Sequence, residues 1–301
     1  MQVFVREVDG VSSPLVRRRR LAVELRELRE AAGLTAEQLA KRIGHSRMKI
    51  SRLENANGRP SVADVIAILD ALGVVGDRWH QMRGMASDAA ERGWWEDYGD
   101  HMGERQQVYA DLEYGAATVR EYTNFVVPGL LQTPEYTKAR AQLARLQARL
   151  PKERNGDRAV DAKIARQRVL RRPDGPCYEA VIDEAAVRRL AAPPEVMRAQ
   201  LLHLADLTTD ERTVIRVLPL GHVIADYWVP RSPFTLYTYR DGDPEVAAVE
   251  SETADMVYTQ ADEVAPYGEL FQRLRQAALS PQDSASFLRA AADDDIQITI
   301  G

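Results

Sequence analysis

The stretch LTAEQLAKRIGHSRMKISRLENANGRP, residues 34–60, decides how the first part of the chain folds. Thr35 and Gln38 are spaced as a capping box, so a helix is predicted to begin at Thr35. Gly44 is placed to end that helix, and Ser46 is placed to cap the next one. Two short helices joined by a tight turn are typical of the helix-turn-helix motif.

The second helix of such a motif must bury one side in the bundle and present the other to the major groove of DNA. At about 100° per residue, Ile50 and Leu53 lie on the buried side. The other sides carry guanidinium, amide and hydroxyl groups, which bond to base edges and phosphates. The residues predicted to contact DNA are Gln38, Arg47, Met48, Lys49, Ser51, Arg52, Asn55 and Arg59. The alternative is a basic, solvated face on a structural helical bundle.

Apolar residues recur at helical spacing on both sides of this motif. They are Leu21, Leu25 and Leu28 before it, and Val65, Leu69 and Leu72 after it. A fifth helix is predicted over residues 77–92. We therefore predict a helical DNA-binding domain over residues 19–92, preceded by an N-terminal arm at residues 1–18.

The charges are distributed unevenly along the chain, which has a net charge of −5. Residues 17–60 hold 12 Lys/Arg and 5 Asp/Glu, a balance of +7. The rest of the chain holds 28 Lys/Arg and 40 Asp/Glu, a balance of −12. A basic end on an acidic chain indicates a module that binds a polyanion, joined to a part with another role.

The larger part of the chain mixes helical and β-type patterns without regular alternation, which predicts an α+β domain over residues 93–292. Helices are predicted over 104–114, 134–150, 156–171, 193–206, 261–278 and 283–292. Strands are predicted over 178–182, 214–218, 234–239 and 246–249, with a further candidate at 256–258. The tail, residues 293–301, reads as an edge strand or a frayed end. The predicted fold class is thus a mainly α helix-turn-helix bundle plus a larger α+β domain.

Composition argues against several other classes of protein. No apolar run approaches the ~20 residues of a membrane helix, and the N-terminus does not read as a secretory signal. Cys177 is the one cysteine, so no intramolecular disulfide can form, and we expect a cytoplasmic protein in which Cys177 is a small buried apolar residue.

No catalytic or metal-binding motif is present, so we expect no enzyme activity, no cofactor and no metal. The acids Asp183 and Glu184 fit the start of a helix better than a catalytic pair. The arginine-rich stretches 166–172 and 188–189 are interpreted as solvated faces, and the alternative is that they bind an acidic partner.

Residues 25–74 resemble the Xre/Cro-type helix-turn-helix of bacterial regulators. The matching positions are Leu34, Thr35, Gln38, Leu39, Ala40, Ile43, Ser46, Ile50, Ser51, Leu53, Glu54, Arg59, Pro60 and Leu72. The resemblance implies that Gln38, Arg47, Ser51 and Arg52 contact DNA. One departure is Ala56, where this family often has glycine, and Gly58 is the candidate to supply the turn instead.

The part from Trp94 to Ala292 resembles the uncharacterised, DUF5753-like domain of Scr1-type, antitoxin-like regulators of actinomycetes. The segments that carry the likeness include WWEDYGD at 94–100, LEYGAATVREY at 112–122 and VPGLLQTPEYTKAR at 127–140. This resemblance implies no catalytic residue.

Together these observations predict a sequence-specific transcriptional regulator that binds a double-stranded DNA operator. A homodimer is expected, because one short helix reads too few bases to define a genomic site. The C-terminal domain is expected to dimerise and to sense a ligand or a small protein encoded nearby. The alternatives are an antitoxin-like module for protein interaction and an enzyme domain addressed to DNA by the helix-turn-helix.

Overall fold

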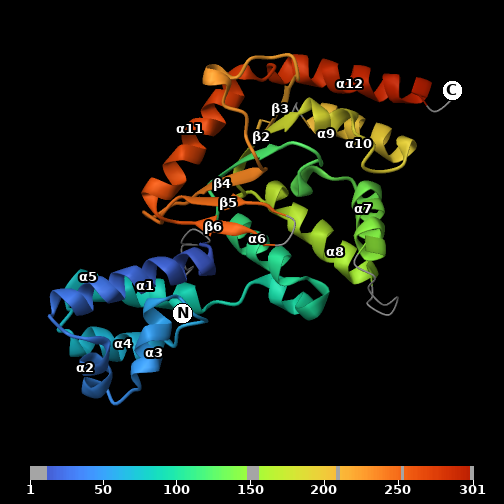
Figure 1. Ribbon diagram of the computed structural model, residues 1–301. Coiled ribbons are helices and arrows are strands. Elements are labelled where there is room, and N and C mark those ends of the chain that lie inside the picture. The colour runs from blue at the N-terminus through green and yellow to red at the C-terminus, as the bar shows by residue number, and fades with distance from the viewer. Residues whose placement is uncertain (1–11, 148–155, 208–210, 252–253, 299–301) are drawn as a thin grey trace, which may run out of the picture. The chain divides into compact units, whose positions relative to one another are not determined.

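The chain folds into two compact units in this computed structural model, which describes residues 12–147, 156–207, 211–251 and 254–298 (Figure 1). The first unit comprises Met1–Asp97 together with Tyr239–Pro244. The second comprises Tyr98–Thr238 and Glu245–Gly301. The boundary falls five residues beyond the one predicted at 92, so Trp94 and Trp95 belong to the first unit.

The first unit is a bundle of helices, as predicted. They are α1 (Pro14–Ala31), α2 (Ala36–Arg42), α3 (Arg47–Glu54), α4 (Val62–Ala71) and α5 (Gly76–Ala90), followed by the 3₁₀ segment η1 (Trp94–His101). Each helix contributes buried apolar side chains to one core, among them Leu21, Leu39, Ile50, Leu69 and Met82. Removing these side chains from water is the main term that stabilises a bundle of this size.

The first helix begins earlier than predicted, which corrects the expected N-terminal arm at residues 1–18. The hydroxyl of Ser13 accepts a hydrogen bond from Val16 N at 3.2 Å, and Pro14 occupies the first turn. A serine cap followed by proline is a strong start signal, because proline's missing N–H needs no partner there. Residues 14–18 are therefore helical, and residues 1–11 lie outside the described part of the chain.

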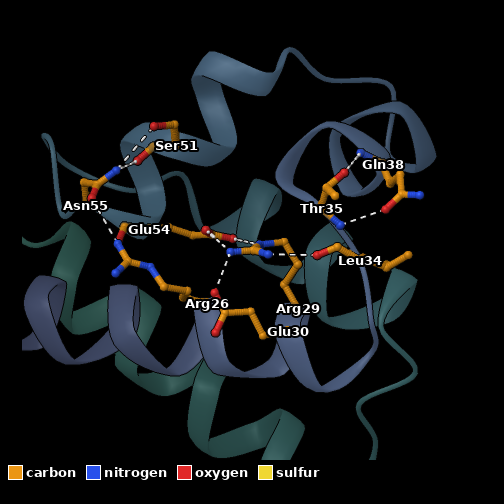
Figure 2. Close-up of polar contacts among 9 residues, drawn as sticks. All are labelled: Arg26, Arg29, Glu30, Leu34, Thr35, Gln38, Ser51, Glu54 and Asn55. Atoms are coloured by element: carbon orange, nitrogen blue, oxygen red, sulfur yellow. Dashed lines mark hydrogen bonds and ion pairs between the residues drawn. The ribbon is translucent and has the colours of Figure 1, made fainter.

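The caps predicted for the motif are present. Gln38 N donates to Thr35 Oγ1 at 3.2 Å, and Thr35 N donates to Gln38 Oε1 at 2.8 Å, which completes the capping box of α2 (Figure 2). Ser46 caps α3 by accepting from Lys49 N at 3.3 Å. After α3, Ala56 takes a φ of +53° and Gly58 a φ of +94°. Ala56 thus adopts the left-handed conformation itself, and Gly58 adds a second residue with a positive φ to the turn, as the prediction for Gly58 had it.

The second unit is an α+β domain built on a mixed six-stranded sheet (Figure 1). The strands are β1 (Thr118–Thr123), β2 (Cys177–Asp183), β3 (Thr213–Leu218), β4 (Phe234–Thr238), β5 (Val246–Val249) and β6 (Met256–Tyr258). Their order is β3-β2-β1-β4-β5-β6, with β1, β2 and β3 parallel and the others antiparallel. The predicted strands are all present, but β1, at the centre of the sheet, was not predicted.

All six helices predicted for the second unit are present, although α12 is longer than predicted and residues 148–150 of the predicted helix 134–150 lie outside the described part of the chain. The helices of this unit are α6 (Glu104–Tyr114), α7 (Pro134–Gln147), α8 (Gly156–Gln167), α9 (Glu184–Arg188), α10 (Pro194–Leu207), α11 (Ala261–Ala277) and α12 (Pro281–Ile298), with short 3₁₀ turns η2 (Gly129–Leu131), η3 (Arg168–Arg171) and η4 (Ala225–Tyr227). The tail predicted as an edge strand or a frayed end is instead helical as far as Ile298.

The two faces of the sheet differ in chemistry. On one face Tyr122, Val181 and Phe234 pack against apolar residues of α11, among them Phe271. Side chains alternate along a strand, so Glu121 of β1 lies on the opposite face. Two further predictions near the sheet are wrong. Cys177 is exposed rather than buried, and Arg166 is mostly enclosed rather than solvated, with 12% of its side chain exposed.

Candidate nucleic-acid interface

The α3 helix has the orientation that the sequence predicts. Ile50 is fully buried in the core of the bundle, and Leu53 packs against that core from a partly buried position. Of the residues predicted to contact DNA, Lys49 is partly buried; the exposed ones are Gln38, Arg47, Met48, Ser51, Arg52, Asn55 and Arg59. The side of α3 that faces away from the bundle is therefore open and carries polar and basic groups.

A buried ion pair holds α3 against α1 (Figure 2). Arg29 Nε lies 2.6 Å from Glu54 Oε1, and Arg29 Nη2 donates to Glu54 Oε2 at 2.9 Å. Arg29 also donates to the carbonyl of Leu34 at 2.8 Å, while Arg26 donates to the carbonyl of Glu54 at 2.5 Å. A fork of two parallel bonds fixes orientation as well as distance. These contacts fix the position of α3 against α1.

Sequence reasoning missed Arg26 and Arg29 as residues that position the site. Glu54 lies among the positions of the family resemblance, but Arg29 is 25 residues away and its partner cannot be inferred from spacing. The hydrogen bonds to Glu54 raise the pKa of the Arg29 guanidinium above its ordinary value. The Arg29 guanidinium thus keeps its charge and its role as the donor in this pair.

Three of the predicted DNA-contacting residues already have partners within the protein. Lys49 Nζ lies 2.7 Å from the carboxylate of Asp64, which also lies 3.0 Å from His45 Nε2. Arg59 Nη2 lies 2.5 Å from Glu96 Oε1.

The third such residue is Asn55. Its Nδ2 donates to the carbonyl of Ser51 at 2.6 Å, and its Oδ1 accepts from Arg26 at 3.0 Å (Figure 2). To bond to DNA, each of these three side chains must first exchange the contact it has.

Two arginines of α3 are not engaged in this way. Within the described part of the chain, neither Arg47 nor Arg52 makes an ion pair. Both side chains are exposed, and Met48 between them is 73% exposed. Guanidinium groups without a carboxylate partner can bond to guanine edges or phosphates without first losing a contact.

A surface hollow of about 420 Å³ lies beside this face of α3. It is lined by Ser46, Met48, Lys49, Arg52, Leu53, Asn57, Arg59, Ser61 and Asp64. Three cationic side chains against one carboxylate give it a positive balance. The hollow also includes the N-cap of α4, where helix N–H groups favour an anion. This arrangement can receive a negatively charged group such as a backbone phosphate.

A second cluster of ionisable residues lies in the other unit, between the sheet and its helices. Glu113 of α6 lies 2.8 Å from Arg166 of α8, and Tyr178 of β2 donates to Glu121 of β1 at 2.6 Å. Burial raises the pKa of Glu113 to about 8 and that of Glu121 to about 7. Each of the two acids has a partner from another element: the first contact joins α6 to α8, and the second joins β2 to β1.

Other expectations for this unit can be compared with the structure directly. Asp183 caps α9 by accepting from Ala185 N at 2.9 Å, and Glu184 occupies the first turn, as predicted. Among the residues described, no group of three or more His, Cys, Asp or Glu could hold a metal ion. Within the same residues, no helix is long and apolar enough to cross a membrane.

The arrangement of α2, turn and α3 within the bundle defines a helix-turn-helix domain, which is the mark of DNA-binding regulators. A family model described as a helix-turn-helix domain matches residues 20–80. A second, described as a domain of unknown function (DUF5753), matches residues 106–290, more than half of the chain. The protein belongs to the DUF5753 family, and the expected order of the two domains is confirmed. Neither curated proteins nor solved structures gave a match.

Proposed function

We propose that this protein is a transcriptional regulator that recognises a specific DNA operator as a homodimer in the cytoplasm. The observation that carries the proposal is the open face of α3, where Arg47 and Arg52 lack carboxylate partners within the described residues. Arg52 reads a base in the major groove, and Arg47, near the start of the helix, contacts a phosphate. Gln38, Met48 and Ser51 complete the contact surface.

Lys49, Asn55 and Arg59 play a second part in this proposal. Lys49 and Arg59 line the hollow beside α3, and all three side chains exchange their protein partners for phosphates once DNA is bound. His45 shares Asp64 with Lys49 and so helps to hold that side chain in place until the exchange.

Selection of bound sequences from a random duplex library, followed by titration of the best site, tests the proposal. Arg52→Ala is expected to weaken operator binding by ~1–3 kcal/mol and to relax the preference at one base pair. Arg47→Ala should weaken binding to all sequences about equally. Arg83→Ala is the matched control, because Arg83 is an exposed arginine on α5 and the charge change is the same. If the double variant Arg47→Ala/Arg52→Ala binds as the wild type does, the assigned face is wrong.

We further propose that the C-terminal domain has no enzyme activity and serves to pair two chains and to sense a small protein or a ligand. Its sequence likeness to antitoxin-like regulators supports a protein partner encoded nearby. A partner changes operator affinity only if it prefers one arrangement of the two helix-turn-helix units. A protein that copurifies from the native cell should therefore shift the operator titration of the full chain. A copurifying protein with no effect on that titration would contradict the sensing role.

A further inference from the structure

The exposed apolar side chains of the second unit gather in three loops at one edge of its sheet. These loops follow β1, α9 and β3 and carry Phe125, Leu190, Leu220, Val223, Tyr227 and Val229, each at least 50% exposed. Elsewhere among the described residues of this unit, only Leu143 and Met256 are large, apolar and comparably exposed. Because β1, β2 and β3 are parallel, the segments that follow them start at the same edge.

Contacts between the loops show that they form one surface. The guanidinium of Arg189 lies 5.6 Å from the centre of the Phe125 ring, which joins the β1 loop to the end of α9. Leu220 N donates to Glu184 Oε2 at 2.9 Å, which joins the β3 loop to the start of α9. We call this surface, residues 124–126, 189–190 and 219–231, the apolar edge.

The loop after β3 is held in a fixed shape. Asp226 and Tyr227 have φ values of +58° and +54°, a left-handed conformation that is costly for a side chain as large as tyrosine. Arg273 of α11 forms an ion pair with Asp226 and lies 5.4 Å from the centre of the Trp228 ring. The result is a preformed loop that presents Tyr227 at 82% exposure.

Contiguous exposed apolar surface on a globular domain marks an interaction site, and rigid tyrosines often dominate binding at such sites. We infer that the apolar edge is the surface through which two copies of this chain pair. This inference rests on the proposed function, since operator recognition by a homodimer requires a pairing surface. The first unit offers no comparable one: among its described residues, the large exposed apolar side chains are Val23, Met48 and Val75, one each on α1, on α3 and before α5.

The charges around the apolar edge favour a second copy over an unrelated partner. A two-fold interface brings the same patch of each subunit together, so the patch must carry both members of each ion pair. The apolar edge carries exposed cations, Arg189 and Arg231, beside Asp226, whose side chain is 78% exposed and can accept further hydrogen bonds besides the one from Arg273. A patch with both signs complements itself, whereas a patch for an acidic or a basic protein would carry one sign.

Sedimentation of the full chain at several concentrations tests the inference. The wild type is expected to be a dimer, and Leu220→Asp/Val223→Asp is expected to raise the dimer dissociation constant by ~100-fold, because charges would be buried without partners. Leu143→Asp is the control on α7, where another exposed apolar side chain is turned into an acid, and it should pair as the wild type does. A wild type that stays monomeric, or a double variant that pairs normally, would overturn the inference.

Hydrogen exchange of the wild type provides a readout that needs no variant. Amides of residues 219–231 and 124–126 should exchange more slowly at concentrations above the dissociation constant than below it. Equal exchange at both concentrations, in a protein that does dimerise, would place the interface elsewhere. If the double variant is monomeric but the wild type binds no specific DNA sequence, the interface stands and the proposed regulator fails. If the wild type stays monomeric but binds a specific DNA sequence, the proposed recognition of DNA stands and the proposed interface fails.

Discussion

Removing the carboxylate of Glu54 should destabilise the helix-turn-helix far more than removing an exposed carboxylate does. Glu54 is 7% exposed and receives both bonds of the Arg29 fork, at 2.6 and 2.9 Å. In Glu54→Ala the guanidinium keeps only the Leu34 carbonyl at 2.8 Å and the exposed Glu30 at 3.2 Å. Breaking a buried ion pair from one side costs about 3–5 kcal/mol, because the remaining charge is left without its partner.

Hydrogen exchange read by mass spectrometry on the full chain measures this loss locally. The amides of α1 and α3 should lose protection by at least a hundredfold, since a factor of ten corresponds to about 1.4 kcal/mol. Peptides from α12, in the other unit, serve as the internal reference. Glu30→Ala is the matched control: it removes the same charge from a partner of Arg29, but at an exposed position, where about 0–1 kcal/mol is expected.

A double variant tests the physical reason for the loss. Arg29→Met/Glu54→Leu removes both charges, keeps most of the volume and leaves no buried ion without a partner. It should therefore recover much of the stability lost in Glu54→Ala. The reasoning is refuted if Glu54→Ala costs no more than Glu30→Ala, or if the double variant is less stable than the single one.

Three other predictions follow from backbone strain, close packing and buried acids. Ala56→Gly should raise the unfolding free energy by about 1 kcal/mol in a urea titration, because Ala56 holds a φ of +53° that glycine adopts without strain; an unchanged midpoint would mean that the turn is not strained. Gly175→Ala should lower the melting temperature, because the added Cβ would lie 2.3 Å from the carbonyl oxygen of Val169. A variant that melts at the same temperature as the wild type would contradict that packing. Burial raises the folded-state pKa values of Glu113 and Glu121 to about 8 and about 7, above their unfolded values near 4.5. The folded state therefore binds more protons than the unfolded state, and the stability measured by calorimetry should fall as pH rises from about 5 to 8. Glu121→Gln should flatten that fall, and a wild type whose stability stays level or rises over the same interval would contradict the raised pKa values.

The parts of the fold with regular apolar spacing could be predicted from the sequence. The apolar stripe that contains Ile50 correctly predicted which side of α3 is buried, and runs of β-branched residues correctly predicted the strands β2 to β5. The central strand β1 was missed because Arg120 and Glu121 interrupt its apolar pattern. Glu121 is tolerated there because Tyr178, 57 residues away in sequence, donates a hydrogen bond to it, and a local sequence pattern cannot predict that contact.

The N-terminal start of α1 is a different kind of miss, because its signal was present in the sequence. Ser13 followed by Pro14 is a helix start, but the predicted arm at residues 1–18 passed over that signal and included Arg17 and Arg18 of the four arginines at 17–20. In the structure these charges are partly neutralised within the first unit. Arg17 and Arg20 lie 2.8 and 3.0 Å from the two carboxylate oxygens of the buried Asp243.

The pairing of Lys49 with Asp64 and of Arg59 with Glu96 has a consequence for how DNA binding responds to ionic strength. Each phosphate that a protein cation neutralises releases condensed counterions, and the slope of log affinity against log salt counts those neutralisations. A cation that gives up a carboxylate to take a phosphate leaves a new unpaired anion, which itself recruits ions from solution. Net ion release is then smaller than the number of Lys and Arg at the interface. The salt slope should therefore report chiefly on Arg47 and Arg52, and Glu96→Gln should steepen it.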